Sequence, residues 1–169
     1  MANFKRVSAY ASGEVDASAD DIWAILRDWG GVMKWVATGP DAPVELTGCE
    51  IKDGDSVEAL PCTRICYFAP ESGFPPFPET LIHADPEARR IYYNVEGVVS
   101  GGMRNYNATT TVDEVGPDRA RITCQSTFDV PGDADPAPVV AFLEGVYNKS
   151  VIKGMERVAR EERARLVGS

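Results

Sequence analysis

Three polar side chains, Arg64, Glu79 and His83, could carry acid–base chemistry in this chain, and all three fall in strand-like stretches. A carboxylate or an imidazole can move a proton, while a guanidinium can stabilise a developing oxyanion. Because an isolated charge in an apolar interior is costly, we expect Arg64 and Glu79 to face each other or to hold waters. Such a pair fits a scaffold and an active site equally well. His83 lies close to the Asp85-Pro86 turn, so an exposed strand-end position is its alternative interpretation.

Strand parity extends this set to the lining of a pocket. Side chains two residues apart share one face of a strand. The groups that this rule assembles mix apolar side chains with one or two polar ones, which is the composition of a ligand pocket. They are Arg64, Cys66 and Phe68; Glu79, Leu81 and His83; Arg104, Tyr106 and Ala108; and Cys124, Ser126 and Phe128.

The composition excludes several classes of function. With 44% hydrophobic and 25% charged residues, the 169 residues suit one globular domain, which we place at 1–169. The 26 acidic side chains outnumber the 17 basic ones, and the net charge of -9 argues against nucleic acid as a partner. No apolar run approaches the roughly 18 residues of a membrane helix, and the first residues lack the apolar core of a signal peptide. We therefore expect a cytoplasmic protein with no membrane partner.

Metal and cofactor sites find no candidate residues in the sequence. The four cysteines form no C-x2-C pair, and a single histidine cannot complete a zinc site, so we expect reduced thiols and no metal. Phosphate-binding, dinucleotide-binding and nucleophile-elbow motifs are missing, namely G-x-x-x-x-G-K-[ST], G-x-G-x-x-G and G-x-S-x-G. We expect no cofactor.

The elements that must position these residues follow an α+β order. Ser18, with Asp21 three residues later, predicts a helix that ends at Gly30-Gly31, and 32–36 adds a short second helical turn. Apolar positions over about five turns from Val139 to Val158 predict one long terminal helix. That helix is the only element long enough to cover a curved antiparallel sheet, and an internal cavity is our hypothesis for the space between them. The predicted strands are 4–15, 44–51, 56–60, 63–68, 79–84, 90–95, 104–115 and 120–130.

Loop and helix aromatics receive different interpretations. Phe74 and Phe77 lie among four prolines, and loop aromatics of this kind often cover an opening. The hypothesis is a proline-stiffened lid over 70–78, hinged near Gly73. The helix tryptophans are expected to belong to the core, outside the sheet: Trp23, Trp29 and Trp35.

Several strings, taken in order, resemble the START-like or SRPBCC superfamily, which includes polyketide cyclases and dehydrases, birch-pollen-type allergens and plant abscisic acid receptors. They are VDASADDIWAILRDW at 15–29 with Lys34-Trp35, ETLIHADPEARRIYYNV at 79–95, RNYNATTTV at 104–112 and EGVYNKSVIKGM at 144–155. The resemblance covers nearly the whole chain. It implies the helix-grip fold, in which a curved antiparallel sheet of about seven strands wraps around a long C-terminal helix, with two short helices after strand 1. The fold hosts binders, carriers and enzymes alike.

The resemblance to the abscisic acid receptors reaches single positions. Residues 72–76 resemble the receptors' gate loop, and 102–104 their second mobile loop. The lysine that engages the hormone's carboxylate is replaced near Pro43 and Val44, which argues against a hormone-like carboxylate ligand. By the same resemblance the pocket is lined by Arg64, Glu79, Tyr93, Tyr106 and Ala108, with Cys66, Phe68 and Cys124 beside them.

These observations predict a protein that binds a small hydrophobic, aromatic or polycyclic molecule and acts on it by cofactor-free acid–base chemistry of the cyclase, dehydratase or carbon–carbon lyase kind. One alternative is a non-catalytic binder, carrier or sensor; another is a structural dimer or chaperone-like module. A homodimer is left open. The candidate catalytic residues are Glu79, Arg64, His83 and Tyr106. The candidate ligand-binding residues are Cys66, Phe68, Phe74, Leu81, Tyr93, Arg104, Ala108, Cys124, Ser126, Phe142, Val146 and Ser150.

Overall fold

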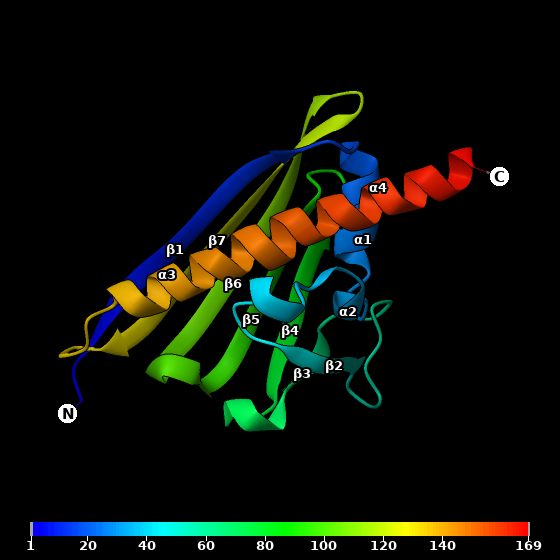
Figure 1. The fold of residues 1–169 in the computed structure, drawn as a ribbon. Helices are drawn as coiled ribbons and strands as arrows, with labels where there is room; N and C mark the ends of the chain where they lie inside the picture. The colour runs from blue at the N-terminus through cyan, green and yellow to red at the C-terminus, as the bar shows by residue number, and fades with distance from the viewer. Residues whose placement is uncertain (1, 169) are drawn as a thin grey trace.

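The structure is a computed structural model that describes residues 2–168. Over these residues, seven strands form one antiparallel sheet in the order β1-β7-β6-β5-β4-β3-β2, so β1 and β2 are its edges (Figure 1). Apart from the β1–β7 pair, neighbours in the sheet are neighbours in the chain. The strands are β1 (Phe4–Val15), β2 (Leu46–Ile51), β3 (Cys62–Phe68), β4 (Phe77–Asp85), β5 (Arg90–Val99), β6 (Met103–Gly116) and β7 (Arg119–Pro131).

Helices occupy one side of this sheet. The short helices α1 (Ala19–Arg27) and α2 (Val32–Trp35) follow β1, and the Ser18 side chain accepts the Asp21 N–H as the predicted cap. The chain ends in one continuous helix made of α3 (Ala137–Val146), a π-helical segment (Tyr147–Ile152) and α4 (Lys153–Val167). This helix runs diagonally along the sheet (Figure 1). The predicted α+β helix-grip architecture is confirmed.

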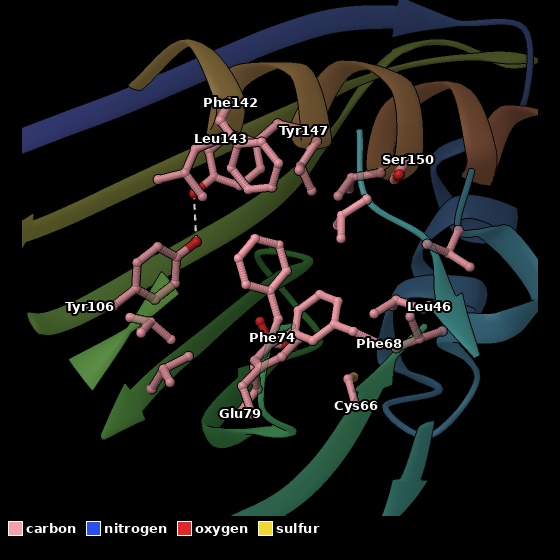
Figure 2. A pocket seen from close by; sticks show the side chains of 18 of the residues that line it. Leu46, Cys66, Phe68, Phe74, Glu79, Tyr106, Phe142, Leu143, Tyr147 and Ser150 are labelled. Atoms are coloured by element: carbon pink, nitrogen blue, oxygen red, sulfur yellow. Dashed lines mark hydrogen bonds between the residues drawn. The ribbon is translucent and has the colours of Figure 1, made fainter. Parts of the chain in front are cut away.

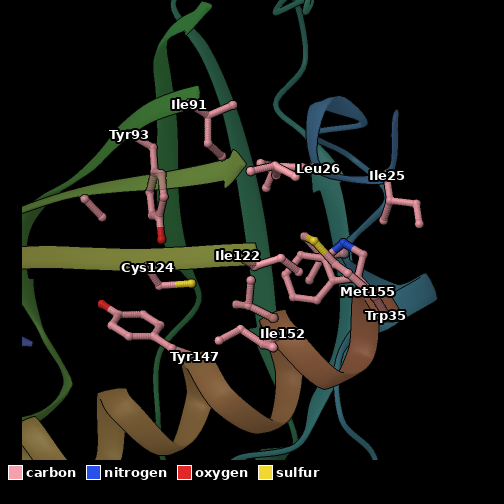
Figure 3. Packing of buried hydrophobic residues seen from close by; sticks show 14 of the residues in the cluster. Ile25, Leu26, Trp35, Ile91, Tyr93, Ile122, Cys124, Tyr147, Ile152 and Met155 are labelled. Atoms are coloured by element: carbon pink, nitrogen blue, oxygen red, sulfur yellow. The ribbon is translucent and has the colours of Figure 1, made fainter. Parts of the chain in front are cut away.

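The core is densely packed where α4 crosses α1 and α2. Met155 and Ile152 of the long helix meet Ile122 of β7 and Trp35 of α2 (Figure 3). Gly154 lies against the main chain of Trp35, so closely that a side chain there would overlap the Trp35 carbonyl oxygen. A glycine is therefore required where the two helices come closest.

One predicted strand is wrong. Residues 56–60 form a loop that holds an isolated bridge between Ser56 and Ala59. Pro61 directly before β3 has no N–H for a ladder, and the Asp55 carboxylate accepts the Thr63 N–H at 2.8 Å in place of a strand partner. Apolar alternation over five residues was too short a signal to distinguish this loop from a strand.

Two β-bulges change which face the later side chains occupy. In β4, Leu81 pairs with Tyr93 but His83 pairs with Tyr92, so one extra residue stands between them. In β6, a similar shift lies between Arg104 and Asn107. A bulge reverses the parity of every residue beyond it. The expectations that His83 shares a face with Leu81, and Arg104 with Tyr106, are therefore wrong.

Candidate functional site

A cavity of about 160 Å³ lies between the sheet and the long helix, lined mainly by apolar side chains (Figure 2). Its floor comes from β3 to β6, its roof from α3 and the π-helical segment, and one wall from α2. The predicted site residues that line it are Cys66, Phe68, Phe74, Glu79, Tyr93, Tyr106, Phe142, Val146 and Ser150.

Glu79 brings a charge into this wall, and Arg64 holds it there. The two residues are register partners on β4 and β3, so they face each other, which is one of the two arrangements expected from the sequence. Glu79 Oε2 accepts two hydrogen bonds from the guanidinium, from Nε at 2.7 Å and from Nη2 at 2.5 Å. Both bonds end on the same oxygen, so Oε1 is not engaged by Arg64. Glu79 lines the cavity, whereas Arg64 lies outside its wall and acts through Glu79.

Arg64 is itself enclosed by Trp29. Its guanidinium lies 3.6 Å from the centre of the Trp29 ring, and its Nη1 donates to the Trp29 carbonyl at 3.1 Å. Only 7% of Arg64 is exposed. Burial acts to lower the pKa of Arg64, but the Glu79 carboxylate and the neighbouring thiols outweigh it, and the pKa is raised. The residue is thus a fixed cation with three partners.

Three hydroxyls form a buried chain beside the cavity. The Tyr106 and Tyr147 oxygens are 2.5 Å apart (Figure 2). Tyr147 donates to Ser126 Oγ at 2.6 Å. Since Tyr147 gives its proton to Ser126, Tyr106 donates to Tyr147. Burial raises the pKa of both tyrosines well above the ordinary value, so both stay neutral. Their hydroxyls use their hydrogen bonds on one another. A ligand would therefore contact these two tyrosines mainly through their aromatic rings.

Tyr93 places another aromatic ring in the wall. Its ring centre lies 5.5 Å from that of Trp29 and 6.3 Å from that of Tyr106. Figure 3 shows its hydroxyl directed between the sheet and the long helix, near Cys124. Burial raises the pKa of this hydroxyl well above the usual value, so it is a donor at neutral pH.

The π-helical segment turns four of its six residues inward. Tyr147, Ser150, Val151 and Ile152 are all buried, and the first three line the cavity. Ser150 Oγ accepts the Ala37 N–H at 3.2 Å, which ties the helix to the segment after α2. π-Helical turns inside α-helices are frequent at functional sites. The sequence pattern gave no signal for this one.

The proline-rich loop contributes Phe74 to the lining of the cavity. Residues 70–72 form a short helical turn, and Gly73 follows with a positive φ of 71°. Phe74 lines the cavity while remaining 40% exposed, and its ring packs edge-on against Phe68 at 5.3 Å. Phe77 stacks on Phe68 at 5.1 Å. The three aromatic rings, which contact one another through Phe68, all line the cavity.

Two candidates lie outside the site because of the bulges described above. His83 is exposed on the far face of the sheet, with its ring 5.8 Å from that of Tyr92. Arg104 is also exposed, and its guanidinium lies 4.8 Å over the Phe4 ring. Neither reaches the cavity. Four more candidates are buried beside the cavity without lining it: Leu81, Ala108, Cys124 and Ser126. For Cys124, burial raises the thiol pKa to about 12.

Several lining residues were missed by the sequence analysis. Trp35, predicted to be core outside the sheet, is buried on the helix side and also lines the cavity with Val32 and Val36. The signal was their helical spacing, which fits a cavity wall as well as a core. The other missed residues are Val44, Leu46, Val95, Val99, Met103, Leu143, Tyr147 and Val151. Phe77, which the sequence placed with Phe74 over an opening, also lines the cavity.

No group of three or more side chains suited to hold a metal ion occurs within residues 2–168. In the same part of the chain, none of the helices combines the length and apolar character needed to cross a membrane.

Comparison with known families and structures places this geometry in context. The profile of a family described as polyketide cyclase / dehydrase and lipid transport matches residues 6–161. No curated protein sequence matches the chain.

Solved structures share the fold at low identity. A solution structure from Thermobifida fusca has a TM-score of 0.71 and 20% identity, covering 92% of this chain and 95% of that one. A point mutant of norcoclaurine synthase from Thalictrum flavum, in complex with a transition-state analogue, has a TM-score of 0.66 and 20% identity over 96% and 99%. The same plant enzyme in complex with dopamine and hydroxybenzaldehyde has a TM-score of 0.60 and 20% identity over 86% of each chain. At these identities the matches establish the shared fold.

Proposed function

The chain belongs to the polyketide cyclase/dehydrase and lipid transport family, and from this premise we propose that it encloses a small aromatic molecule that carries a hydrogen-bond donor, and that Glu79 accepts a proton from it. The observation that carries the proposal is the Glu79 carboxylate, which stands in an apolar cavity with one oxygen held by Arg64 and the other turned to no guanidinium donor.

The size of the cavity limits the ligand. A volume of about 160 Å³ is close to the roughly 150 Å³ of an apolar cavity that binds benzene. With Phe74 in place, the space therefore suits one aromatic ring with its substituents. A polycyclic ligand requires Phe74 to move outward, since this ring forms the mouth.

The Glu79 carboxylate in the cavity wall limits which polar substituent the ligand can carry. A carboxylate accepts hydrogen bonds and offers none, so Glu79 Oε1 pairs with a hydroxyl or an ammonium group. Aromatic rings of Phe68, Tyr93 and Tyr106 pack around the rest of the molecule. Dopamine and hydroxybenzaldehyde, found in complex with the plant enzyme of this fold, are single-ring molecules with such hydroxyls.

Catalysis in this arrangement consists of proton transfer. Glu79 Oε1 takes a proton from the bound hydroxyl or from an acidic carbon, and the negative charge that develops on the substrate is met by the Tyr93 hydroxyl. Arg64 keeps Glu79 in one orientation during the transfer. In a dehydratase reaction this proton then goes to the hydroxyl that leaves as water when the C–O bond breaks. In a lyase reaction it goes to the carbon released when the C–C bond breaks, and in a cyclase reaction it goes to the alkoxide formed when the carbanion adds to a carbonyl carbon, so none of the three steps needs a cofactor.

A non-catalytic binder or carrier is the second candidate, and a specific observation favours it. The Tyr106, Tyr147 and Ser126 hydroxyls are engaged with one another, and His83 is outside. Among the described residues of the wall, the groups that could act as a second acid beside Glu79 are tyrosine hydroxyls and the Cys66 thiol, and their pKa values are raised. Binding alone would use the same anchor and the same rings.

Phenol and toluene, which differ by one hydroxyl, test the anchor in NMR titrations. Because a hydrogen bond to a charged group is worth about 1.5–3 kcal/mol, we expect phenol to bind about tenfold or more tightly than toluene. In Glu79→Gln the amide oxygen keeps the hydrogen bonds from Arg64, so the NH2 group takes the place of the free carboxylate oxygen. That position then no longer accepts a hydrogen bond from the phenol hydroxyl, and the preference for phenol over toluene disappears. The exposed Glu87→Gln variant serves as the matched control. Equal affinities of the two probes for the unmodified protein would refute the anchor.

The catalytic step needs a substrate, which native mass spectrometry of protein purified from its own host identifies as a retained molecule. With that molecule or its chemical class, Glu79→Gln is expected to abolish turnover, a loss far larger than the roughly tenfold or greater loss of affinity that the missing anchor causes. A parallel loss of both would assign Glu79 to binding alone, and the second candidate function would replace the first.

A further inference from the structure

Cys49 and Cys66 form a thiol pair at the edge of the sheet. They are direct register partners on β2 and β3, and their sulfur atoms are 2.7 Å apart. Both are free thiols in this structure. Cys62 and Cys124 are buried and have other neighbours, Leu81 and Thr110.

The positions of the two strands already suit a covalent bond. Directly opposed residues on antiparallel strands point to the same face, with their Cβ atoms close together. A disulfide has an S–S length of about 2.05 Å, so the two sulfurs need to approach by less than about 1 Å. Rotation of the two side chains supplies such a movement without displacing a strand.

The two thiols differ in access and in proton affinity. Cys49 is half-buried, while Cys66 is 1% exposed and lines the cavity. The hydrogen bond with Cys66 lowers the pKa of Cys49, with help from the Arg64 guanidinium, although burial opposes this. The same hydrogen bond and burial raise the pKa of Cys66. Cys49 is therefore the thiol that ionises and meets a reagent from solution.

We propose that Cys49 and Cys66 are a redox modification site, at which a peroxide closes a reversible intramolecular disulfide. The Cys49 thiolate attacks one oxygen of hydrogen peroxide; the O–O bond breaks, a sulfenic acid forms, and the other oxygen leaves as water after taking a proton. The Cys66 sulfur then attacks the Cys49 sulfur; the S–O bond breaks, and the hydroxide leaves as water with the Cys66 proton. Two thiols and one hydrogen peroxide thus give one disulfide and two waters.

The disulfide would join the edge strand β2 to β3 beside the cavity. β2 pairs only with β3 in the described sheet, and its Leu46 lines the cavity. The cross-link therefore fixes one rim of the cavity, and it does so whether or not the protein acts on a ligand. The proposal goes beyond the proposed function and does not depend on it.

Peptide mapping of the full chain tests the proposal. The protein is treated with hydrogen peroxide, free thiols are blocked with N-ethylmaleimide, and the unreduced protein is digested with trypsin. Cysteines 49, 62 and 66 lie close together in the sequence, but cleavage after Lys52 and Arg64 places Cys49, Cys62 and Cys66 on separate peptides. We expect the protein to lose the mass of two hydrogens, and peptides 35–52 and 65–89 to be linked. Dithiothreitol should restore both thiols.

Two variants separate this pair from general oxidation. Cys49→Ser should abolish the linked peptide and leave Cys66 as a thiol, whereas the control Cys62→Ser should retain the link. If either substitution impairs folding, the mapping of the unmodified chain still decides. The proposal is overturned if peroxide leaves both thiols free to react with maleimide after denaturation, oxidises Cys49 to a sulfinic acid without a link, or links other cysteines.

Discussion

Arg64 is surrounded by the Glu79 carboxylate, the Trp29 carbonyl and the Trp29 ring. Every charge-bearing part of its guanidinium therefore has a partner although the residue is almost fully buried. Removing one member of such a pair leaves the other charge without compensation in an apolar interior, which costs more than the intact pair contributes. The Arg64–Glu79 pair therefore stabilises the fold and also fixes the orientation of the carboxylate that lines the cavity.

The Arg64→Met variant should lose about 3–5 kcal/mol of unfolding free energy, because Glu79 is then left as a buried, unpaired charge. Replacing both residues, as Arg64→Met with Glu79→Leu, should recover part of that loss since no charge remains. Urea denaturation, read as the midpoint and slope, measures the difference. The exposed pair of Arg119 and Glu14 provides a control in which Arg119→Met has little effect. A double variant as unstable as the single one would contradict the prediction.

Among single residues, the sequence was most informative where one strand faces the next without interruption. Arg64 and Glu79 lie on uninterrupted stretches of β3 and β4, and the cost of an isolated buried charge favoured the direct pairing that is observed. Strand parity placed Cys66 and Phe68 in the pocket, and both line the cavity. Leu81 and Cys124, which parity also assigned to the pocket, are buried but do not line the cavity. Strand parity predicts that a side chain is buried, but it does not reveal where dense packing ends and a cavity begins.

At the scale of the elements, the two β-bulges in β4 and β6 determine which candidate side chains reach the cavity. Asn105 adopts a positive φ of 51° at the β6 bulge, a conformation that asparagine tolerates better than most residues. Nothing in the local sequence marks the β4 bulge at Ile82, whose side chain is left exposed. Since a bulge depends on how two strands pair, alternation within one strand could not predict that His83 and Arg104 point away.

The close contact between the long helix and α2 predicts how a glycine-to-alanine substitution changes the stability of the protein. Gly154→Ala should destabilise the protein by about 1–3 kcal/mol, because the new Cβ would overlap the rigid main-chain carbonyl of Trp35. Gly145→Ala, on the same helix, meets nothing within 4 Å and should stabilise by up to about 1 kcal/mol through helix propensity. Thermal and urea unfolding of both variants provide the comparison. Equal effects of the two substitutions would mean that the helices can separate freely.

The lid over 70–78 predicts a change in hydrogen exchange. Because Phe74 covers the cavity while partly exposed, saturating phenol should slow deuterium uptake by residues 70–78. Phe74→Ala should remove this protection and speed up phenol release, as measured by NMR line-shape analysis. Tyr10→Ala, an exposed aromatic on β1, is the control and should change neither. Unchanged exchange of 70–78 in the presence of phenol would rule out the lid.

At the scale of the whole molecule, the long helix packs densely at one end and stands off from the sheet at the other. Near α4, Ile152 and Met155 fill the space against Ile122 (Figure 3). In α3, Phe142 and Leu143 border the cavity (Figure 2). Element order and helix length predicted the overall arrangement. The volume of the cavity depends on how individual rotamers fill the gap, and on the π-helical segment, so the sequence could suggest a cavity but not its size.

The burial of several weak acids in one core predicts how the stability of the molecule depends on pH. Burial raises the pKa of the Cys124 thiol to about 12 and raises those of Tyr93, Tyr106 and Tyr147 above the ordinary value. In the unfolded chain these groups lose their protons near their ordinary pKa values, about 8.5 for cysteine and about 10 for tyrosine. Between those values and the raised ones the folded state binds more protons than the unfolded state, so the free energy of unfolding falls as pH rises.

We therefore expect these four groups to leave the urea midpoint unaffected between about pH 6 and pH 8, and to lower it progressively from about pH 9 to pH 12. Tyr106→Phe removes one of the buried acids, so the alkaline decline should become shallower even if the lost bond to Tyr147 lowers stability at neutral pH. The slope of midpoint against pH separates these two effects, because the missing hydrogen bond shifts the whole curve while the missing proton changes its steepness. A midpoint that is constant up to pH 12, or a slope unaltered in Tyr106→Phe, would show that these hydroxyls reach solvent in the folded protein and that the closed core described here is open.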